Sequence, residues 1–404
     1  MNNVKHIGIF GRRNAGKSSL INLLLGQDFA IVSEKAGTTT DPVKKRMEIP
    51  GVGPVQLVDT AGIDDIGEVG EKRVAKSLKL VEEVDLALLL FTGNIFGKEE
   101  KELLMQFKEL DVPVVVVHNQ SDIIPLDCGV AGDLTNMYGC DVVEFSCCMT
   151  EPQEQQEAID MLFAFITKGL LVQGGEKTIM HGLVEEGDNI VLVCPIDSEA
   201  PAGRMILPQV MAIRDILDNG GIATVLQPEQ LEEYLKDFNP DTNSKKVKMV
   251  VTDSQAFKQV GEIVPQEIPL TSFSVLMARA KGPFEEYLKG VEAIGKLKEG
   301  DNVLVLESCT HHTSCEDIGR VKIPMMLQKK AGCKLNFTFV SGLDELPPLE
   351  KFALVLQCGG CMVTHRQLRN RLRRVIAAGL PVTNYGMCIA YVTGIFQRSI
   401  LTLI

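Results

Sequence analysis

Near its start the chain reads Gly11-Arg12-Arg13-Asn14-Ala15-Gly16-Lys17-Ser18, and this stretch decides the fold. It follows the apolar run from His6 to Phe10 and opens a helical pattern that ends at Leu25. A G-x-x-x-x-G-K-S match between a strand and a helix is typical of a phosphate-binding loop, because backbone N–H groups and the helix dipole both favour an anion there. The structural alternative is a glycine-containing turn before a helix. We expect the nucleotide to contact these residues of the loop and helix: Gly11, Asn14, Ala15, Gly16, Lys17, Ser18 and Ser19.

Composition limits the possible locations and partners of the protein. The chain has 404 residues, enough for two or three domains, and no apolar run approaches the ~18 residues that a membrane span needs. The polar N-terminus resembles no signal peptide, and eleven cysteines then favour a reducing cytoplasm, where thiols serve as core residues, ligands or catalysts. A net charge of −12 and the absence of tryptophan disfavour nucleic acid as a partner. We expect a cytoplasmic protein that binds neither membranes nor nucleic acid.

The pattern of apolar runs predicts an α/β chain with three domains. In residues 1–168, strand runs alternate with helical patterns, which predicts a doubly wound sheet with ligands at the carboxyl ends of its strands. The main strand runs are Val55–Val58, Leu86–Phe91, Val114–Val117 and Val142–Phe145. Residues 169–270 continue the strand–helix rhythm without a catalytic constellation, and we interpret them as a middle, dimerisation domain. Residues 271–404 form a third α/β domain with its own cysteine motifs.

Further motifs of a guanine-nucleotide switch follow the predicted strands in the expected order. Asp59-Thr60-Ala61-Gly62 would hold Mg²⁺ through its aspartate and sense the γ-phosphate through the Gly62 amide. Asn119-Gln120-Ser121-Asp122 ends in a carboxylate that can accept two hydrogen bonds from guanine, which adenine cannot donate. Ser146-Cys147 would complete the base pocket, and Thr39 is the expected Mg²⁺ ligand of the first switch. The residues expected to act on GTP and Mg²⁺ are Lys17, Ser18, Thr39, Asp59 and Gly62.

This set resembles the translation-factor-related GTPases, in particular the branch that contains Era and the tRNA-modifying GTPases. Two residues depart from the pattern. Gln120 replaces the usual lysine of the base motif, and Ile63 stands where a water-orienting glutamine often stands, so hydrolysis should be slow. In the resembled branch, an asparagine at the position of Asn14 helps to hold a K⁺ that replaces an arginine finger. Asn14 is therefore either a K⁺ ligand or only a turn residue.

Cysteines follow two predicted strands of the third domain. The run Asn302–Leu306 leads to Cys309, and the run Phe352–Leu356 leads to Cys358-Gly359-Gly360-Cys361. Because parallel strands end at the same edge of a sheet, we expect the three thiols to share a site. Three converging thiolates suit either an iron–sulfur cluster or a Cys₃His zinc site, with His311 as a candidate fourth ligand.

Several features of the third domain allow more than one interpretation. A thioredoxin-like dithiol would use Cys358 and Cys361 alone, and three unconnected cysteines are the structural alternative. Glu307 is a second candidate for a fourth ligand. The helix that begins with a capping box at Thr364 is basic, and its arginines either attract an anionic precursor or form a solvated face. The arginines on one face of this helix are Arg366, Arg369 and Arg373.

A GTPase domain, a middle domain and a Cys-x-His … Cys-x-x-Cys domain resemble, in this order, the [FeFe]-hydrogenase maturation GTPases over essentially the whole chain. The resemblance implies that Cys309, Cys358 and Cys361 bind a [4Fe-4S] cluster, with His311 at the histidine position of the first motif. Many members carry a histidine directly before the Cys-x-x-Cys motif, where this chain has Gln357. The resemblance also implies a homodimeric carrier on which a two-iron CO/CN precursor is assembled with two radical-SAM maturases. This subcluster is then transferred to the apo-[FeFe]-hydrogenase.

These observations predict a GTP-hydrolysing scaffold in which GTP alters partner docking or cluster exposure instead of doing redox chemistry. The alternative is an RNA-modification or ribosome-assembly GTPase with a structural Cys₃His zinc site. A third hypothesis is a thiol oxidoreductase fused to a GTPase. Iron and sulfide would favour the scaffold, stoichiometric zinc the alternative, and redox cycling of the cysteine pair without metal the third hypothesis.

Overall fold

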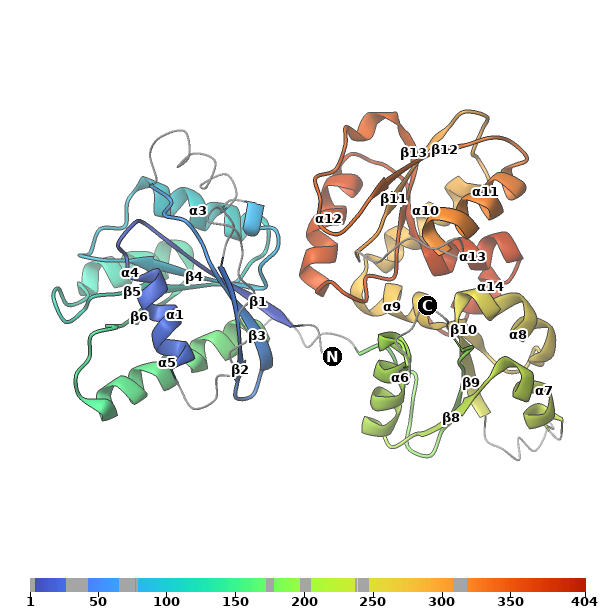
Figure 1. The fold of residues 1–404 in the computed structure, drawn as a ribbon, viewed down its shortest axis with the longest axis horizontal. Coiled ribbons are helices and arrows are strands. Elements are labelled where there is room, and N and C mark those ends of the chain that lie inside the picture. The colour runs from blue at the N-terminus through green and yellow to red at the C-terminus, as the bar shows by residue number, and fades with distance from the viewer. Residues whose placement is uncertain are drawn as a thin grey trace. The chain divides into compact units, whose positions relative to one another are not determined.

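The structure is a computed structural model, and it describes residues 4–26, 43–64, 77, 79–171, 178–196, 205–236, 238, 247–308 and 318–404. Three residues with predicted roles, Thr39, Cys309 and His311, lie outside these ranges. The chain divides into two units, Met1–Gly175 and Glu176–Ile404 (Figure 1). The finer division into residues 1–168, 169–270 and 271–404 stays a prediction.

The first unit is built on a six-stranded sheet with the order β2-β3-β1-β4-β5-β6. All neighbouring strands are parallel except β2, which runs antiparallel to β3. The central strand β4 reads Leu-Ala-Leu-Leu-Leu-Phe and is buried along its whole length, as expected for a strand covered on both faces. The strands are β1 (Lys5–Gly11), β2 (Val43–Ile49), β3 (Gly53–Asp59), β4 (Leu86–Phe91), β5 (Val114–His118) and β6 (Asp141–Glu144).

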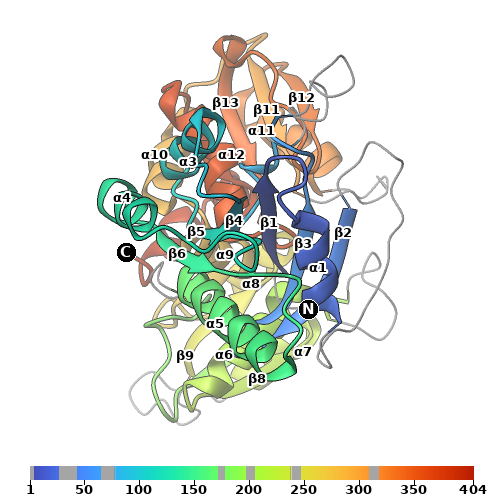
Figure 2. The same cartoon turned by 90° about the vertical axis from the view of Figure 1, so that its left-hand side faces the viewer.

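Helices cover both faces of this sheet. One apolar core joins the sheet to α1 (Lys17–Leu25) and α5 (Pro152–Leu171), and a second core joins its other face to α3 (Lys98–Glu109) and α4 (Cys128–Tyr138). Figure 2 gives the same arrangement after a turn of 90°. The predicted doubly wound α/β domain is therefore confirmed, and its loops converge at the carboxyl ends of the parallel strands.

The second unit contains two four-stranded parallel sheets with the orders β10-β9-β7-β8 and β12-β11-β13-β14. The strands of the first are β7 (Asn189–Val193), β8 (Ile222–Leu226), β9 (Val247–Thr252) and β10 (Leu270–Ser272). Those of the second are β11 (Asn302–Leu306), β12 (Asn336–Val340), β13 (Phe352–Gln357) and β14 (Val382–Asn384). The α-helices are α6 (Leu207–Asp218), α7 (Pro228–Leu235), α8 (Phe257–Ile263), α9 (Phe273–Lys281), α10 (Phe284–Ile294), α11 (Ile323–Ala331), α12 (His365–Ala377), α13 (Tyr385–Thr393) and α14 (Phe396–Ile400).

One apolar core joins the two sheets of this unit. It contains Leu192 of β7 and Leu304 of β11, together with most of helix α9. Helix α10 lies so close to β14 that a side chain at Gly290 would collide with the carbonyl oxygen of Val382. The two sheets are therefore held together by shared packing as well as by the chain that connects them.

The predicted strands Asn302–Leu306 and Phe352–Leu356 are confirmed as β11 and β13, and β13 extends one residue further, to Gln357. A short π-helical turn, Ile318–Lys322, precedes α11. The capping box at Thr364 is present: its hydroxyl accepts from the N–H of Gln367, and the Gln367 side chain accepts from the N–H of Thr364. This reciprocal pair begins α12 directly after the cysteine loop.

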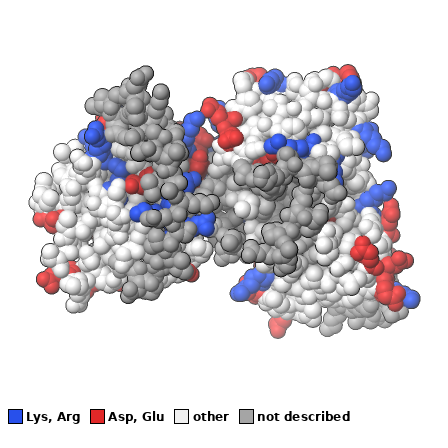
Figure 3. Space-filling view, viewed as in Figure 1, with Lys and Arg blue, Asp and Glu red and all other residues white. Residues whose placement is uncertain are grey.

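No helix among the described residues is both long and apolar enough to cross a lipid bilayer. On the face drawn in Figure 3, the basic and acidic side chains of the described residues are interspersed. The sequence carries 41 basic and 53 acidic residues, which gives the chain a net negative charge.

Candidate functional site

The glycine-rich loop connects β1 to α1 with backbone conformations that few residues adopt. Gly16 has a φ of 88° and Asn14 a φ of 60°, both in the left-handed region. A side chain at Gly16 would collide with the amide nitrogen of Asn119, which donates to the carbonyl of Ala15 at 2.9 Å. The base motif after β5 therefore packs on the loop, and only glycine fits at position 16.

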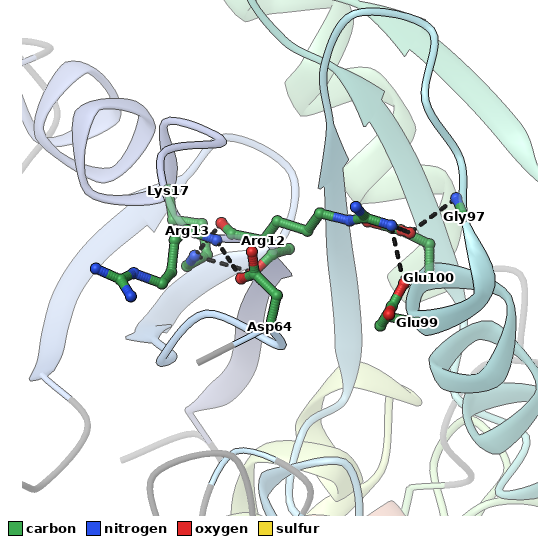
Figure 4. A network of polar contacts seen from close by, with 8 residues as sticks. Arg12, Arg13, Lys17, Asp64, Gly97, Glu99 and Glu100 are labelled. Carbon is green, nitrogen blue, oxygen red and sulfur yellow. Dashed lines mark hydrogen bonds and ion pairs between the residues drawn. The ribbon is translucent and has the colours of Figure 1, made fainter. Parts of the chain in front are cut away.

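Inside the loop, the Lys17 ammonium group donates to the carbonyls of Gly11 at 3.0 Å and Arg12 at 2.7 Å. The Lys17 residue is only 8% exposed, so its charge is held close to the loop backbone. The backbone N–H of Arg13 donates to Asp64 Oδ1 at 2.7 Å (Figure 4). Loop amides directed at a carboxylate are the type of group that binds phosphate oxygens.

The segment after β3 lies against the same loop. The N–H of Ile63 donates to the carbonyl of Gly11 at 3.2 Å, and a side chain at Gly62 would meet the Arg13 nitrogen at 2.9 Å. The structure thus places Gly62, the predicted γ-phosphate sensor, beside the phosphate-binding loop. Ile63, which stands in the sequence where a water-orienting glutamine often stands, lies beside the same loop.

Two oxygen groups predicted to bind Mg²⁺ meet at the start of α1. The Ser18 hydroxyl donates to Asp59 Oδ2 at 2.7 Å. The other oxygen, Asp59 Oδ1, is buried and has no hydrogen-bond partner among the described residues. Mg²⁺ prefers oxygen ligands, so a hydroxyl beside a partly unsatisfied carboxylate fits this ion. The third predicted oxygen ligand, Thr39, lies outside the described residues.

An arginine–glutamate network fixes the outer side of the loop (Figure 4). Arg12 Nε donates to Glu100 Oε1 at 2.6 Å, and Arg12 Nη2 donates to Glu100 Oε2 and Glu99 Oε2, each at 2.9 Å. The hydrogen bond to Glu100 raises the pKa of Arg12. Glu100 is fully buried and also accepts from the N–H of Gly97, so α3 positions the arginine. The sequence analysis missed this network, although a glutamate three residues into a helix is a known capping signal.

The predicted base-binding residues lie together after β5 and β6. The Ser146 hydroxyl donates to Asp122 Oδ1 at 2.5 Å, which orients the exposed carboxylate that should read guanine. Gln120 Nε2 donates to the carbonyl of Asn14 at 3.2 Å, so glutamine still ties the base motif to the loop. The Cys147 thiol donates to Asn119 Oδ1 at 3.6 Å, and burial raises the pKa of Cys147 to about 11. This thiol is therefore a neutral packing group, not a nucleophile.

In the second unit, neighbouring strands bring the cysteine motifs together. Strands β11 and β13 pair in parallel with Leu306 opposite Gln357, and the N–H of Cys358 donates to the carbonyl of Leu306 at 2.9 Å. The N–H of Ser308 donates to the sulfur of Cys358 at 3.0 Å. Since Ser308 directly precedes Cys309, the predicted neighbourhood of the two strand ends is confirmed up to the last residue before Cys309. Cys309 and His311 themselves lie outside the described residues.

The sulfur of Cys358 accepts a second hydrogen bond, from Gln357 Nε2 at 3.4 Å. The same amide nitrogen donates to Ser308 Oγ at 2.9 Å, while Gln357 Oε1 is buried without a partner in the described chain. The hydroxyl of Tyr287 is likewise buried and lacks a hydrogen-bond partner in the described chain. Burial raises the pKa of Tyr287, and the charge of Cys358 adds to this rise. Unsatisfied polar atoms around a thiol are typical of a binding site.

Cys361 lies in the same loop, held from α9. The buried Lys281 ammonium group donates to the carbonyls of Gly360 at 3.4 Å and Val363 at 3.2 Å. Burial and then the charge of Cys358 raise the pKa of the Cys361 thiol, and the charge of Lys281 opposes this rise only in part. A buried cation at this loop would stabilise thiolates that bind a metal.

Other candidates of the sequence analysis have structural partners. The carboxylate of Glu307 is bound by Arg320, at 2.7 Å from Nη2, and by the Ser341 hydroxyl at 3.2 Å, so it is engaged away from the thiols. Cys194 and Cys388 are buried, and burial raises the pKa of each to about 12, as expected for thiols that pack in a core. The described residues contain no group of three potential metal ligands.

Three models of known protein families match the chain. Residues 6–120 match the 50S ribosome-binding GTPase family model. Residues 179–282 match the hydrogen maturase F dimerization domain, and residues 285–402 match the hydrogen maturase F tetramerization domain. These last two matches together span more than half of the chain. The chain belongs to the hydrogen maturase F family.

This membership confirms the resemblance to hydrogenase maturation GTPases that the sequence predicts. The order of domains in this hydrogen maturase F family member is a GTPase domain, then the domain named for dimerization, then the domain named for tetramerization. The predicted α/β fold class with an N-terminal P-loop GTPase domain is confirmed as well.

Individual relatives match mainly the GTPase domain. The tRNA modification GTPase MnmE of Nitrosomonas eutropha is 38% identical over 114 residues, which are 28% of this chain and 25% of that protein. MnmE of Aliarcobacter butzleri is 42% identical over 120 residues (29% and 27%), and that of Chromobacterium violaceum is 33% identical over 175 residues (43% and 36%). The matched part is thus about a quarter to a third of these relatives.

Two solved structures match the chain at low identity. The G domain of the T. maritima FeoB iron transporter shares 22% identity at a TM-score of 0.29, over 40% of this chain and 99% of that one. A variant of Aquifex aeolicus Era bound to GDP and aluminium fluoride shares 21% identity at a TM-score of 0.35, over 58% of this chain and 98% of that one.

The base pocket generates a test of nucleotide choice. An Asp122→Asn substitution should lower the affinity for GDP by about a hundredfold, because the new amide donates where guanine also donates. The same amide complements the carbonyl of xanthine, so affinity for xanthosine diphosphate should rise above that for GDP. Titration of both nucleotides measures the preference.

The matched control is Asp127→Asn. Asp127 accepts two hydrogen bonds, from the backbone N–H groups of Gly129 and Val130 at the start of α4, and it lies outside the base motif. This variant should keep the preference for guanine. An unchanged preference in Asp122→Asn would show that Asp122 does not read the base.

Proposed function

We propose that the protein is a GTP-hydrolysing scaffold that binds a [4Fe-4S] cluster through Cys309, Cys358 and Cys361. On it the two-iron subcluster of the H-cluster is assembled and from it transferred to the apo-[FeFe]-hydrogenase. One observation carries the proposal: the N–H of Ser308, the residue before Cys309, donates to the sulfur of Cys358 at 3.0 Å. This contact occurs in a domain that matches a hydrogen maturase F model.

The GTPase half of the proposal rests on the loop that links β1 to α1. Backbone amides and Lys17 would bind the phosphates, while Ser18 and Asp59 would hold Mg²⁺, which neutralises charge on the β- and γ-phosphates. Gly62 lies against the loop and would report the γ-phosphate. Hydrolysis should be slow, because Ile63 has no side-chain group that could orient a water molecule.

The cysteine half rests on the thiols and the donors around them. Thiolates are the usual ligands of iron–sulfur clusters, and hydrogen bonds to their sulfurs tune the cluster. Cys358 accepts two such bonds, and Lys281 holds the loop of Cys361 through the carbonyls of Gly360 and Val363. His311 is the proposed fourth ligand. A cluster in this position would be bound at the carboxyl end of the sheet, where its exposed side could receive a two-iron CO/CN precursor.

The proposed partners follow from membership of the family: the apo-[FeFe]-hydrogenase, two radical-SAM maturases and a second copy of the chain. The GTP-bound and GDP-bound states would differ in the segments near Thr39 and Gly62, and this difference would change partner docking or access to the cluster. A cytoplasmic location without nucleic-acid or membrane partners belongs to the same proposal.

Metal analysis tests the cysteine site. The protein purified without oxygen and supplied with iron and sulfide should be brown and contain both elements, with the electron paramagnetic resonance signal of a reduced [4Fe-4S] cluster. Cys358→Ser and Cys361→Ser should each lose most of the bound iron and keep GTP hydrolysis, because the two sites lie in separate units. Cys128→Ser is the control, since Cys128 is an exposed thiol on α4 of the GTPase unit.

Two outcomes would contradict the scaffold. A colourless protein with one zinc per chain would favour the RNA-modification or ribosome-assembly GTPase with a structural zinc site. A protein that binds neither metal, with a cysteine pair that cycles between dithiol and disulfide, would favour the oxidoreductase hypothesis.

Potassium dependence tests Asn14. The proposal predicts that GTP turnover is about tenfold or more faster in K⁺ than in Na⁺ at equal ionic strength, since K⁺ would replace an arginine finger. Asn14→Gly should remove this difference, because glycine keeps the left-handed conformation and lacks the amide ligand. Equal rates of the unmodified protein in both salts would leave Asn14 as a turn residue.

The edge strand β8 is the proposed surface for the second copy. It ends the sheet and carries exposed apolar side chains, with Ile222 55% and Val225 44% exposed. The adjacent helix α6 adds Leu217, which is 58% exposed. An edge without charged or proline residues is open to strand pairing, and this strand lies in the part matched by the dimerization model. Pairing of β8 with β8 about a two-fold axis would bury these side chains.

Size-exclusion chromatography with light scattering tests this surface. The unmodified protein should elute as a dimer or larger oligomer, and Val225→Lys should shift the equilibrium toward smaller species, because a buried lysine lacks a partner there. The control Met137→Lys changes a side chain that is 69% exposed on α4 and should leave the oligomer intact. An unchanged mass of Val225→Lys would exclude this edge.

A further inference from the structure

The inference concerns Arg371, one of several arginines on helix α12. Arg369, Arg373 and Arg374 of this helix are exposed, whereas Arg371 is only 7% exposed. It falls four residues after Gln367 and four before Val375, both of which are buried. Arg371 is therefore part of the stripe that α12 turns toward the sheet.

The guanidinium group of Arg371 lies over the carboxyl ends of two strands. Nη1 donates to the carbonyl of Glu307 at 3.0 Å, and Nη2 donates to the carbonyl of Val340 at 3.1 Å. The remaining donor, Nε, is buried and has no hydrogen-bond partner among the described residues. The hydrogen-bond partners of this side chain are thus two neutral carbonyl groups. Within the described chain, no carboxylate lies at hydrogen-bonding distance from its positive charge.

A buried charge of this kind is costly unless a negative charge lies nearby. The carboxylate of Glu307, the residue whose backbone carbonyl Arg371 binds, is already bound by Arg320 through both of its oxygens. Burial lowers the pKa of Arg371, and among the groups that oppose this effect Cys358 acts most strongly. The carbonyl that Nη1 binds belongs to Glu307, and the next residue, Ser308, donates its N–H to the sulfur of Cys358. The thiolate of Cys358 is therefore the negative charge that the cysteine loop itself offers to Arg371, in addition to the carboxylate of Asp344.

We propose that Arg371 is a positioning residue that supplies a buried counter-charge to the cysteine site, stabilising its thiolates and the negative charge of the group they bind. The inference rests on the proposed function, since it requires that the thiolates hold an iron–sulfur cluster. A cluster gains one negative charge when it takes up an electron, so a fixed cation beside it favours the reduced form. The exposed arginines of α12 are screened by water and have little influence on the cluster.

The experiment measures the reduction potential of the reconstituted cluster, by titration with dithionite followed by electron paramagnetic resonance. Arg371→Gln removes the charge, Arg371→Lys keeps it, and Arg374→Gln removes an exposed charge from the same helix. In Arg371→Gln the equilibrium constant for reduction should fall tenfold or more, which corresponds to a potential lower by about 59 mV or more for one electron. Arg371→Lys and Arg374→Gln should stay within about threefold of the unmodified protein.

The outcomes separate this inference from the proposed function. Should the unmodified protein form no cluster, the proposed function fails and this inference with it. If the cluster forms but its potential is the same in Arg371→Gln, the inference alone is wrong, and Arg371 only ties the strand ends together. A purely structural arginine would also show equal losses of thermal stability in the glutamine and lysine variants, without a shift in potential.

If Arg371→Gln does not fold, Arg371→Met decides the question, because methionine also removes the charge and is a flexible apolar side chain that tolerates burial. A tenfold or larger fall in the equilibrium constant for reduction in Arg371→Met, with Arg371→Lys within about threefold of the unmodified protein, supports the role of the charge. A potential of folded Arg371→Met equal to that of the unmodified protein contradicts it.

Discussion

Parallel pairing of strands is the constraint on which both candidate sites depend. In a parallel sheet all carboxyl ends lie at one edge, so loops that are distant in the sequence meet there. In the first unit the loop after β1 contacts Asn119, which follows β5. In the second unit the register of β11 and β13 places Ser308 beside the sulfur of Cys358. Without this register, the cysteine motifs would be unrelated loops.

The two sites satisfy their buried charges in different ways. In the nucleotide site, Arg12 binds the buried carboxylate of Glu100, and the Lys17 ammonium group is surrounded by loop carbonyls. In the cysteine site, Lys281 and Arg371 also donate to carbonyls, but no described carboxylate lies at hydrogen-bonding distance from Arg371. The outer arginine of the first site is thus neutralised by a buried carboxylate, while the buried arginine of the second site is bound by backbone carbonyls.

The sequence was sufficient to predict the elements that are long and apolar. Strand β4 is an uninterrupted apolar run, and β11 and β13 are recognised in the same way. Strand β2 lies at the edge of its sheet and has the sequence Val-Lys-Lys-Arg-Met-Glu-Ile, in which charged residues interrupt the apolar pattern typical of a strand. Strand β10 is only three residues long. These strands exist because a neighbouring strand supplies their hydrogen bonds, which no local pattern records.

Prediction of site residues follows the same limit. The phosphate-binding loop and the guanine motif are local in sequence, so their residues could be named in advance. Glu100 acts on Arg12 from 88 positions away, and Arg371 binds a carbonyl 64 positions away. Arg371 does not fall on the face of Arg366, Arg369 and Arg373, and its spacing from Gln367 and Val375 places it on the buried stripe. The helical spacing indicates a buried position for Arg371, whereas the charge of an arginine side chain favours the prediction of an exposed one.

Helix α9 gives the cysteine loop an anchor outside its own sheet. The helix directly follows β10 of the first sheet of the unit, and its last residue, Lys281, donates to the carbonyls of Gly360 and Val363. Residues 179–282 and 285–402 match separate family models, so a cut between them would look natural. A fragment that begins after the cut would keep both thiols of the Cys-x-x-Cys motif but lose the ammonium group that holds their loop in shape.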